Sequence, residues 1–376
     1  MGAQRRTCQA VVAAVVLCAG ARALASVQVE PIARLSLEGG YDSNFLYDGR
    51  GGDVMGRVSP DLGLTLRDHT WVLALVGGGD LLLYEQRARA PVWNQRGTLQ
   101  LAMRPDHRST LTAEVGVIYA ADPIGLARLG IFGRSDAGLI VQGAARAAWR
   151  LDHDWRIAGT FAERVVRFDD GTGAASHTPG VEATRQLDHH LEVGGAYRFD
   201  VFQAFGAGAQ DAYANELQAV ARYRWTRRLT MEAEGGPALW IPPGAGAPSV
   251  LPQAMVQLLE VGRVVDARVT LRHGVGLGIL ATPGLTDTVE AAATLKLGRS
   301  WKLHSEGGIW RSGAIPWGAD GVVGYGIAGE VLWLLGGGVQ VGFGASRFAR
   351  ADSGTTLYDR NIVGLRVGWE LRGAHH

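Results

Sequence analysis

The sequence predicts an all-β fold, a transmembrane up-and-down barrel of antiparallel strands, on three observations. Apolar and polar residues alternate with a period of two along most of the chain. Short turns alternate with longer connections rich in Gly, Ala and Pro. The composition is 47% hydrophobic and 19% charged, with 54 glycines among 376 residues, so the chain is too apolar to be disordered. Together these observations predict about eighteen strands, with sixteen as the alternative count.

The alternation is clearest in residues 191–201, 217–225 and 363–371. Each segment places apolar side chains in one phase and charged or small ones in the other, as with Val367 and Arg366. Successive side chains of a strand point to opposite faces, so one face of each segment is apolar. Tryptophans collect towards the predicted strand ends, as expected of aromatic belts at the two membrane–water interfaces.

Turn signals divide the chain into these strands. Eight short turns carry Asp-His pairs, arginines or glycines: 68–69, 106–107, 152–153, 188–189, 226–228, 263–266, 298–300 and 336–338. Nine longer connections lie near 42–54, 86–94, 121–135, 169–178, 204–212, 242–250, 281–286, 312–320 and 350–357. Asp favours turns because its carboxylate accepts hydrogen bonds from nearby backbone. Eight turns and nine loops separate eighteen strands, with the short turns expected on the periplasmic side.

The first 25 residues have the three parts of a secretory signal. Arg5 and Arg6 precede a short apolar run, and residues 23–25 (ALA) form a cleavage site. We therefore expect a signal peptide at 1–25 and a single barrel domain at 26–376. Both cysteines, Cys8 and Cys18, lie in the predicted signal, so the mature chain has no disulfide or thiolate chemistry.

Several function classes are excluded on composition and motifs. A formal net charge of +1 argues against a nucleic-acid partner. The chain has no G-x-S-x-G or H-E-x-x-H motif, and five of its ten histidines fall in predicted turns, with His177 expected in a loop. We therefore predict that the chain is not an enzyme and binds no metal or other cofactor.

The polar phase of the strands supplies the candidate functional residues. In a barrel this wide, side chains alone do not fill the interior, so polar inward residues line water and set selectivity. The alternative is that they pair across strands and keep the wall rigid. The candidates are Arg34, Glu38, Glu114, Arg146, Arg150, Arg198, Arg222, Arg224, Glu232, Arg268, Arg272, Glu330 and Arg366, with Glu192, Glu216, Glu234, Lys296 and Glu306 in the same phase. The long, apolar connection at 121–135 places Arg128 and Arg134 near a constriction if it folds inward.

Two segments near the N-terminus carry a family resemblance. Residues 40–44 (GYDSN) resemble a recurring entry motif of outer-membrane barrels, and residues 58–64 (VSPDLGL) follow on the next strand. Together they resemble the β-barrel porins of exopolysaccharide gene clusters, including the eighteen-stranded polysaccharide-export porins of myxobacteria. The match covers about residues 32–66. Residues 364–371 are similar to the C-terminal signal read by the barrel-insertion machinery, although five more residues follow.

The resemblance implies a location and a function. We expect an integral protein of the Gram-negative outer membrane, in contact with its lipid and inserted through its C-terminal strand. The leading hypothesis is a charged-lumen channel that exports a polysaccharide, together with a periplasmic export partner. The alternatives are a general or solute-selective diffusion porin and a structural or adhesive barrel.

Overall fold

The computed structural model describes residues 27–43, 51–85, 91–121, 137–206, 208–244, 246–279, 281–313, 321–352 and 355–372. The predicted signal peptide lies outside these residues. No helix in the described part of the chain is long and apolar enough to cross a membrane. The strands are β1 (Gln28–Asp42), β2 (Asp53–Arg67), β3 (Trp71–Tyr84), β4 (Val92–Met103), β5 (Ser109–Ala120), β6 (Gly138–Arg150), β7 (Trp155–Phe168), β8 (Gly173–Gln186), β9 (Leu191–Phe205), β10 (Ala212–Arg224), β11 (Leu229–Ile241), β12 (Ser249–Val261), β13 (Val265–Leu277), β14 (Pro283–Leu297), β15 (Trp301–Gly313), β16 (Val322–Gly336), β17 (Val339–Asp352) and β18 (Thr355–Arg372).

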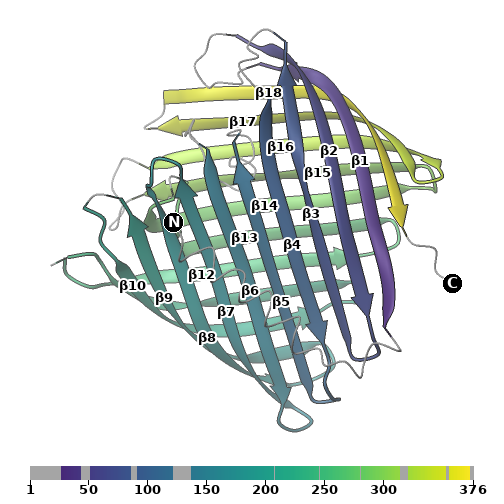
Figure 1. Ribbon diagram of the computed structural model, residues 1–376. Helices are drawn as coiled ribbons and strands as arrows, with labels where there is room; N and C mark the ends of the chain where they lie inside the picture. The colour runs from purple at the N-terminus through teal and green to yellow at the C-terminus, as the bar shows by residue number, and fades with distance from the viewer. Residues whose placement is uncertain are drawn as a thin grey trace.

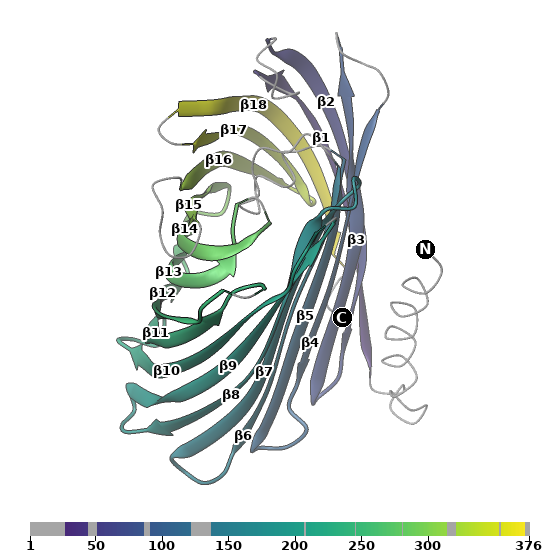
Figure 2. The same ribbon diagram turned by 90° about the vertical axis from the view of Figure 1, so that its left-hand side faces the viewer.

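The strands form one closed antiparallel sheet, so the predicted fold class and the count of eighteen are confirmed. Each strand pairs with its neighbours in sequence, and β1 pairs with β18 to close the barrel, with Leu35 opposite Trp369. Strands of the near wall cross those of the far wall (Figure 1), and the view turned by 90° shows β3–β5 facing β13–β18 (Figure 2). A closed sheet leaves no edge strand with unpaired backbone groups, which lipid could not satisfy.

The predicted short turns lie between consecutive strands, and several share one hydrogen-bond pattern. The Asp188 carboxylate accepts from the backbone N–H of His190 at 2.6 Å and of Leu191 at 2.8 Å. Asp106 and Asp152 accept from the backbone in the same positions. These bonds close a tight turn without a long loop, which explains why Asp recurs at the start of these turns.

The longer connections differ from the prediction at several points. Only residues 169–172 separate β7 from β8, because the small residues at 173–178 that resemble a loop belong to β8. The connection predicted at 281–286 comes earlier, since β13 ends at Leu277 and β14 begins at Pro283. Only residues 353 and 354 separate β17 from β18, where a connection was predicted at 350–357. Small residues are common in both loops and barrel strands, so composition alone places these boundaries poorly.

The outer surface of the barrel is apolar. Large hydrophobic side chains from strands around the whole barrel are exposed, among them Leu37, Leu62, Leu217 and Leu365. At the strand ends near the short turns, aromatic rings replace aliphatic side chains, as where Trp301 stacks on Trp333 with ring centroids 5.7 Å apart. Such a surface fits a hydrocarbon core bounded by an aromatic belt.

Candidate functional site

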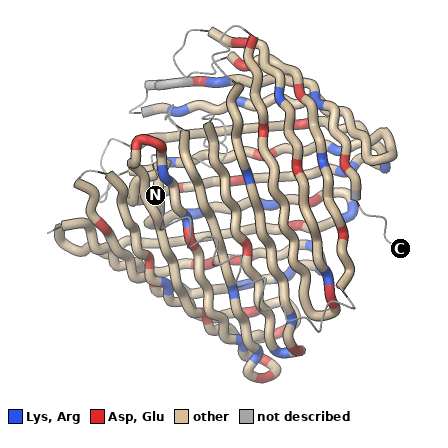
Figure 3. The backbone as a smooth tube through the Cα atoms, in the orientation of Figure 1, with Lys and Arg blue, Asp and Glu red and all other residues tan. Residues whose placement is uncertain are grey.

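The cross-strand register puts all thirteen candidate residues on one face of the sheet, opposite the exposed apolar one. Arg222 lies opposite both Glu192 and Glu232, and Glu38 opposite Arg366. Basic and acidic residues are interspersed over the barrel and are not segregated (Figure 3). The strand register places the thirteen candidates on the inner face. Their role as pore-lining groups stays a prediction.

The densest set of ion pairs is the Arg222 network, made of Arg146, Glu182, Glu192, Arg222 and Glu232. Arg222 donates to Glu182 at 2.7 and 2.9 Å, to Glu232 at 2.7 Å and to Glu192 at 3.2 Å. Arg146 donates to both oxygens of Glu182 at 2.8 and 3.1 Å. Planar guanidinium groups make such multiple contacts, which lysines cannot. The network joins β6, β8, β9, β10 and β11 across the inner face.

Further inward pairs stiffen the wall on either side of the closing seam. Arg57 donates to Glu38 at 3.1 Å, and Arg366 to Glu330 at 2.8 Å. Another pair joins Arg34 of β1 to Glu370 of β18 at 2.8 Å. These contacts show the cross-strand pairing that the sequence left open as one alternative, while the role of the same residues in selectivity stays a prediction.

The seam also contains one fully buried ion pair near the end opposite the short turns. The side chains of Arg360 and Asp42 are both 0% exposed. Arg360 donates to the two carboxylate oxygens of Asp42 at distances of 2.5 to 3.1 Å. A buried charge pair that is hydrogen-bonded this well fixes the register of β1 on β18. Asp42 belongs to the segment that carried the family resemblance.

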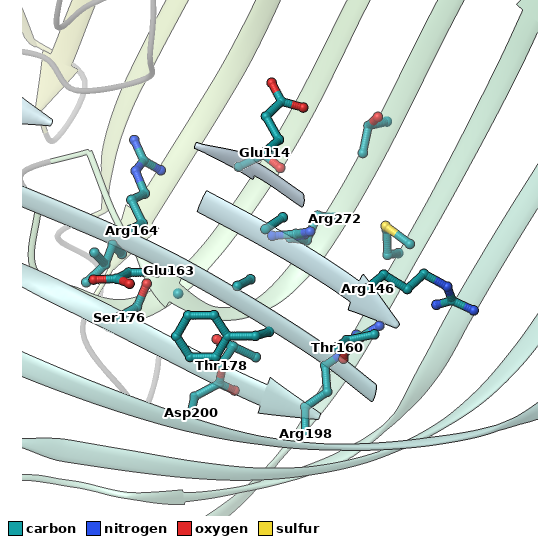
Figure 4. A pocket seen from close by; sticks show the side chains of 18 of the residues that line it. Glu114, Arg146, Thr160, Glu163, Arg164, Ser176, Thr178, Arg198, Asp200 and Arg272 are labelled. Carbon is teal, nitrogen blue, oxygen red and sulfur yellow. The ribbon is translucent and has the colours of Figure 1, made fainter. Parts of the chain in front are cut away.

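A cavity of about 960 Å³ lies inside the barrel (Figure 4). Four of the thirteen candidates line it: Glu114, Arg146, Arg198 and Arg272. The other nine lie on the inner face elsewhere. Charged residues that line the cavity but were not among the candidates are Glu163, Arg164, Asp200, Glu290 and Arg311. With Glu216 and Glu234, the lining holds five arginines and six carboxylates, so no single charge dominates it.

The end of β13 and the turn that follows it fold into the barrel. Val275 and Leu277 pack against a cluster around Phe202 and Trp240. The next residues of the segment reach two other sectors of the wall. Ile279 packs with Met55, Leu82 and Phe348, and Ala281 packs with Ile140 and Phe168. Residues 275–279 and Ala281 thus contact three sectors of the wall and narrow the lumen, and Gly278 and Ile279 also line the cavity.

Hydrogen bonds hold this inward turn in place, and one of its residues has a strained backbone. Gly278 donates its backbone N–H to the carbonyl of Thr282 at 2.8 Å, and Ala281 donates to that of Gly278 at 2.9 Å. Ile279 donates to the Ser312 hydroxyl at 3.2 Å. Ala281 has φ +56°, a left-handed conformation that costs a non-glycine residue energy. Its packing, with 2% exposure, compensates for the strain.

The sequence did not predict the constriction formed by the end of β13. It predicted one from the connection at 121–135. Arg128 and Arg134 lie outside the described residues, so their predicted role stays a prediction. Residues 274–279 alternate glycine with Val275, Leu277 and Ile279, a pattern that reads as a lipid-facing strand. One feature of the sequence indicated that this segment could bend inward. Three glycines, Gly274, Gly276 and Gly278, occupy alternate positions at the end of a weakly patterned strand.

The histidines are placed mainly in turns and in pairs with acids. His177 lies in β8, not in a loop as predicted, with its Nδ1 3.7 Å from Glu163. The Nδ1 of His273 lies 2.6 Å from Asp287 on the neighbouring strand. In the turns, the backbone N–H groups of His190 and Leu191 lower the pKa of Asp188, because they favour the ionised carboxylate. Asp106 and Asp152 have lowered pKa values for the same reason.

The chain matches no family model and no curated protein sequence. Among solved structures, it is similar to the outer membrane protein opdK of Pseudomonas aeruginosa, at 10% identity over 92% of this chain and 99% of that chain, with a TM-score of 0.46. OccAB2 of Acinetobacter baumannii gives 7% identity, 92% and 98% coverage and a TM-score of 0.43. A structure described as a bacterial polysaccharide outer membrane secretin gives 10% identity, 91% and 98% coverage and a TM-score of 0.33.

Proposed function

We propose that the chain is an outer-membrane channel that passes small polar solutes through a narrowed lumen. One observation carries the proposal: a closed barrel with an apolar outer surface encloses a cavity of about 960 Å³ lined by charged and hydroxyl side chains. Charges are tolerated beside an aqueous lumen and are costly against lipid. The paired charges of the wall predict weak discrimination between anions and cations.

The constriction favours this proposal over the export of a polysaccharide. Residues 275–279 and Ala281 contact three sectors of the wall, so a polymer would pass only if these residues moved aside. Polysaccharide export, with a partner on the periplasmic side, stays the second proposal. The export proposal rests on the sequence resemblance of residues 32–66. This segment includes Asp42, which forms the buried ion pair with Arg360. A structural or adhesive barrel is the third and predicts no conduction.

Conductance in a planar bilayer tests the proposal. The refolded mature chain is expected to give steady channels with a reversal potential near zero in a salt gradient. Ile279→Gly removes the side chain that reaches across to Met55 and is expected to raise the conductance. Val29→Gly, at an exposed position near the start of β1, is the matched control and should leave it unchanged. Inserted but silent barrels would refute the channel, and uptake of oligosaccharides but not of small solutes would favour export.

A further inference from the structure

Two carboxylates meet on the inner face of the barrel. Asp200 of β9 and Glu216 of β10 are diagonal neighbours, because Asp200 lies opposite Ala214 and Glu216 lies opposite Arg198. Their side chains are within hydrogen-bonding reach of each other, and the residues are only 6% and 5% exposed. Both line the cavity. Two carboxylates this close and this buried repel each other unless a cation or a proton lies between them.

The neighbouring polar groups are neutral. The Thr178 hydroxyl donates to Oδ1 of Asp200, and the amide of Gln218 donates to Glu216 at 2.8 Å. The amide of Gln253 donates to the other oxygen of Glu216. These bonds orient the two carboxylates without neutralising their charge. Oδ2 of Asp200 is buried and has no hydrogen-bond donor among the described residues.

The guanidinium group of Arg198, which lies opposite Glu216, already pairs with other side chains. Arg198 donates to Glu234 at 2.6 Å and to the side-chain carbonyl of Gln218 at 2.6 Å. The charged groups here are therefore the three carboxylates of Asp200, Glu216 and Glu234 and the single guanidinium group of Arg198. A buried carboxylate oxygen without a donor is costly, and a bound cation with N–H groups removes that cost.

We propose that Asp200 and Glu216 form a subsite for the ammonium group of a small solute in the lumen. This inference rests on the proposed channel function and names the chemistry of its solute. An ammonium group presents three N–H donors, which suits the unpartnered Oδ2 of Asp200 and the adjacent carboxylate of Glu216. A hard divalent cation such as Ca²⁺ needs six to eight oxygen ligands, more than these groups offer.

The other lining residues show where this subsite lies within the cavity. Figure 4 shows Asp200, Thr178 and Arg198 at one side of the cavity and Arg164 well apart from them. Arg164 and Arg272 share that part of the lining with Glu290, so both signs of charge occur there. The subsite also lies next to the constriction, since Phe202 and Ala214 flank Asp200 and belong to the cluster that Val275 and Leu277 contact.

Block of single-channel current by putrescine, a diammonium without a carboxylate, tests the subsite. Putrescine is expected to interrupt the current of the wild type. Asp200→Asn and Glu216→Gln keep the shape of each side chain and are expected to weaken the block about tenfold or more, as the loss of one charge-assisted hydrogen bond predicts. Glu330→Gln is the matched control, because Glu330 is an inward carboxylate outside the cavity lining and should retain the block.

The outcomes separate this inference from the channel function. Channels that conduct but ignore putrescine would overturn the subsite and leave the channel function standing. A block equally strong in Asp200→Asn, Glu216→Gln and the control would also overturn it. If no channel conducts, the channel function fails, and calorimetric titration of putrescine into the detergent-solubilised barrel still tests the site. Binding of CaCl₂ in place of putrescine, lost in the same two variants, would refute the ammonium assignment.

Discussion

Replacing Arg222 by Gln tests whether the inner face controls both stability and ion selectivity. Glutamine keeps some hydrogen bonding and removes one positive charge from the centre of the Arg222 network. Glu232 then loses its charged partner in the network, while Glu182 keeps Arg146. The wall therefore gains one uncompensated negative charge beside the lumen.

The magnitude follows from the contacts. Arg222 makes hydrogen bonds to Glu182 of 2.7 and 2.9 Å, and the Glu182 side chain is 4% exposed. Losing charged hydrogen bonds to such a group costs about 2–3 kcal/mol of unfolding free energy. In water, one added charge acts on an ion about 7–10 Å away with roughly 0.4–0.6 kcal/mol, a two- to threefold change in local ion concentration.

Two measurements check this prediction. Urea unfolding in detergent micelles is expected to show a lower midpoint, and the reversal potential in a KCl gradient should shift towards cation selectivity by about two- to threefold in the permeability ratio. Arg347→Gln is the control, because Arg347 pairs with Asp359 at 2.7 Å and lies on the outer face of the barrel, opposite the exposed Ile327. An unchanged or anion-shifted potential in the Arg222 variant would refute the inference that this network faces the conducting path.

Three further predictions concern the seam, the constriction and the turns. Arg360→Met leaves a buried carboxylate on Asp42 and is expected to lower the unfolding free energy by about 3–5 kcal/mol, with Asp42→Leu in the same chain restoring most of it in urea titrations. Ala281→Gly relieves the left-handed strain and should raise the urea midpoint by the equivalent of about 1 kcal/mol, whereas a drop would show that the methyl packing against the wall matters more. Because the folded pKa of Asp188 is depressed, its stabilising effect is present above the ordinary aspartate pKa of about 3.9 and is lost as the pH falls through the lower folded value. The midpoint difference between wild type and Asp188→Ala should therefore vanish in strong acid, and a difference that persists there would contradict the backbone hydrogen bonds as its cause.

The sequence predicted the barrel because its signals are local. Period-two alternation fixes which face of a strand meets lipid, and an Asp that caps its own turn needs only the next three residues, as at Asp188. The placement of Arg222 on the inner face followed from the same alternation. Boundaries failed where small residues serve equally in a strand and a loop, as at 173–178.

The amino-acid sequence by itself determined the turns and the two faces of the wall, since each depends on residues within one hairpin, and it narrowed the strand count to eighteen or sixteen. Only the tertiary structure decided which inward residues meet. Asp200 and Glu216 are sixteen positions apart, and Ile279 reaches Met55 across the lumen. The constriction and the cavity depend on how the barrel closes and on where one segment bends into it. That bend is fixed by packing against distant strands, which the alternation of residues 274–279 does not encode.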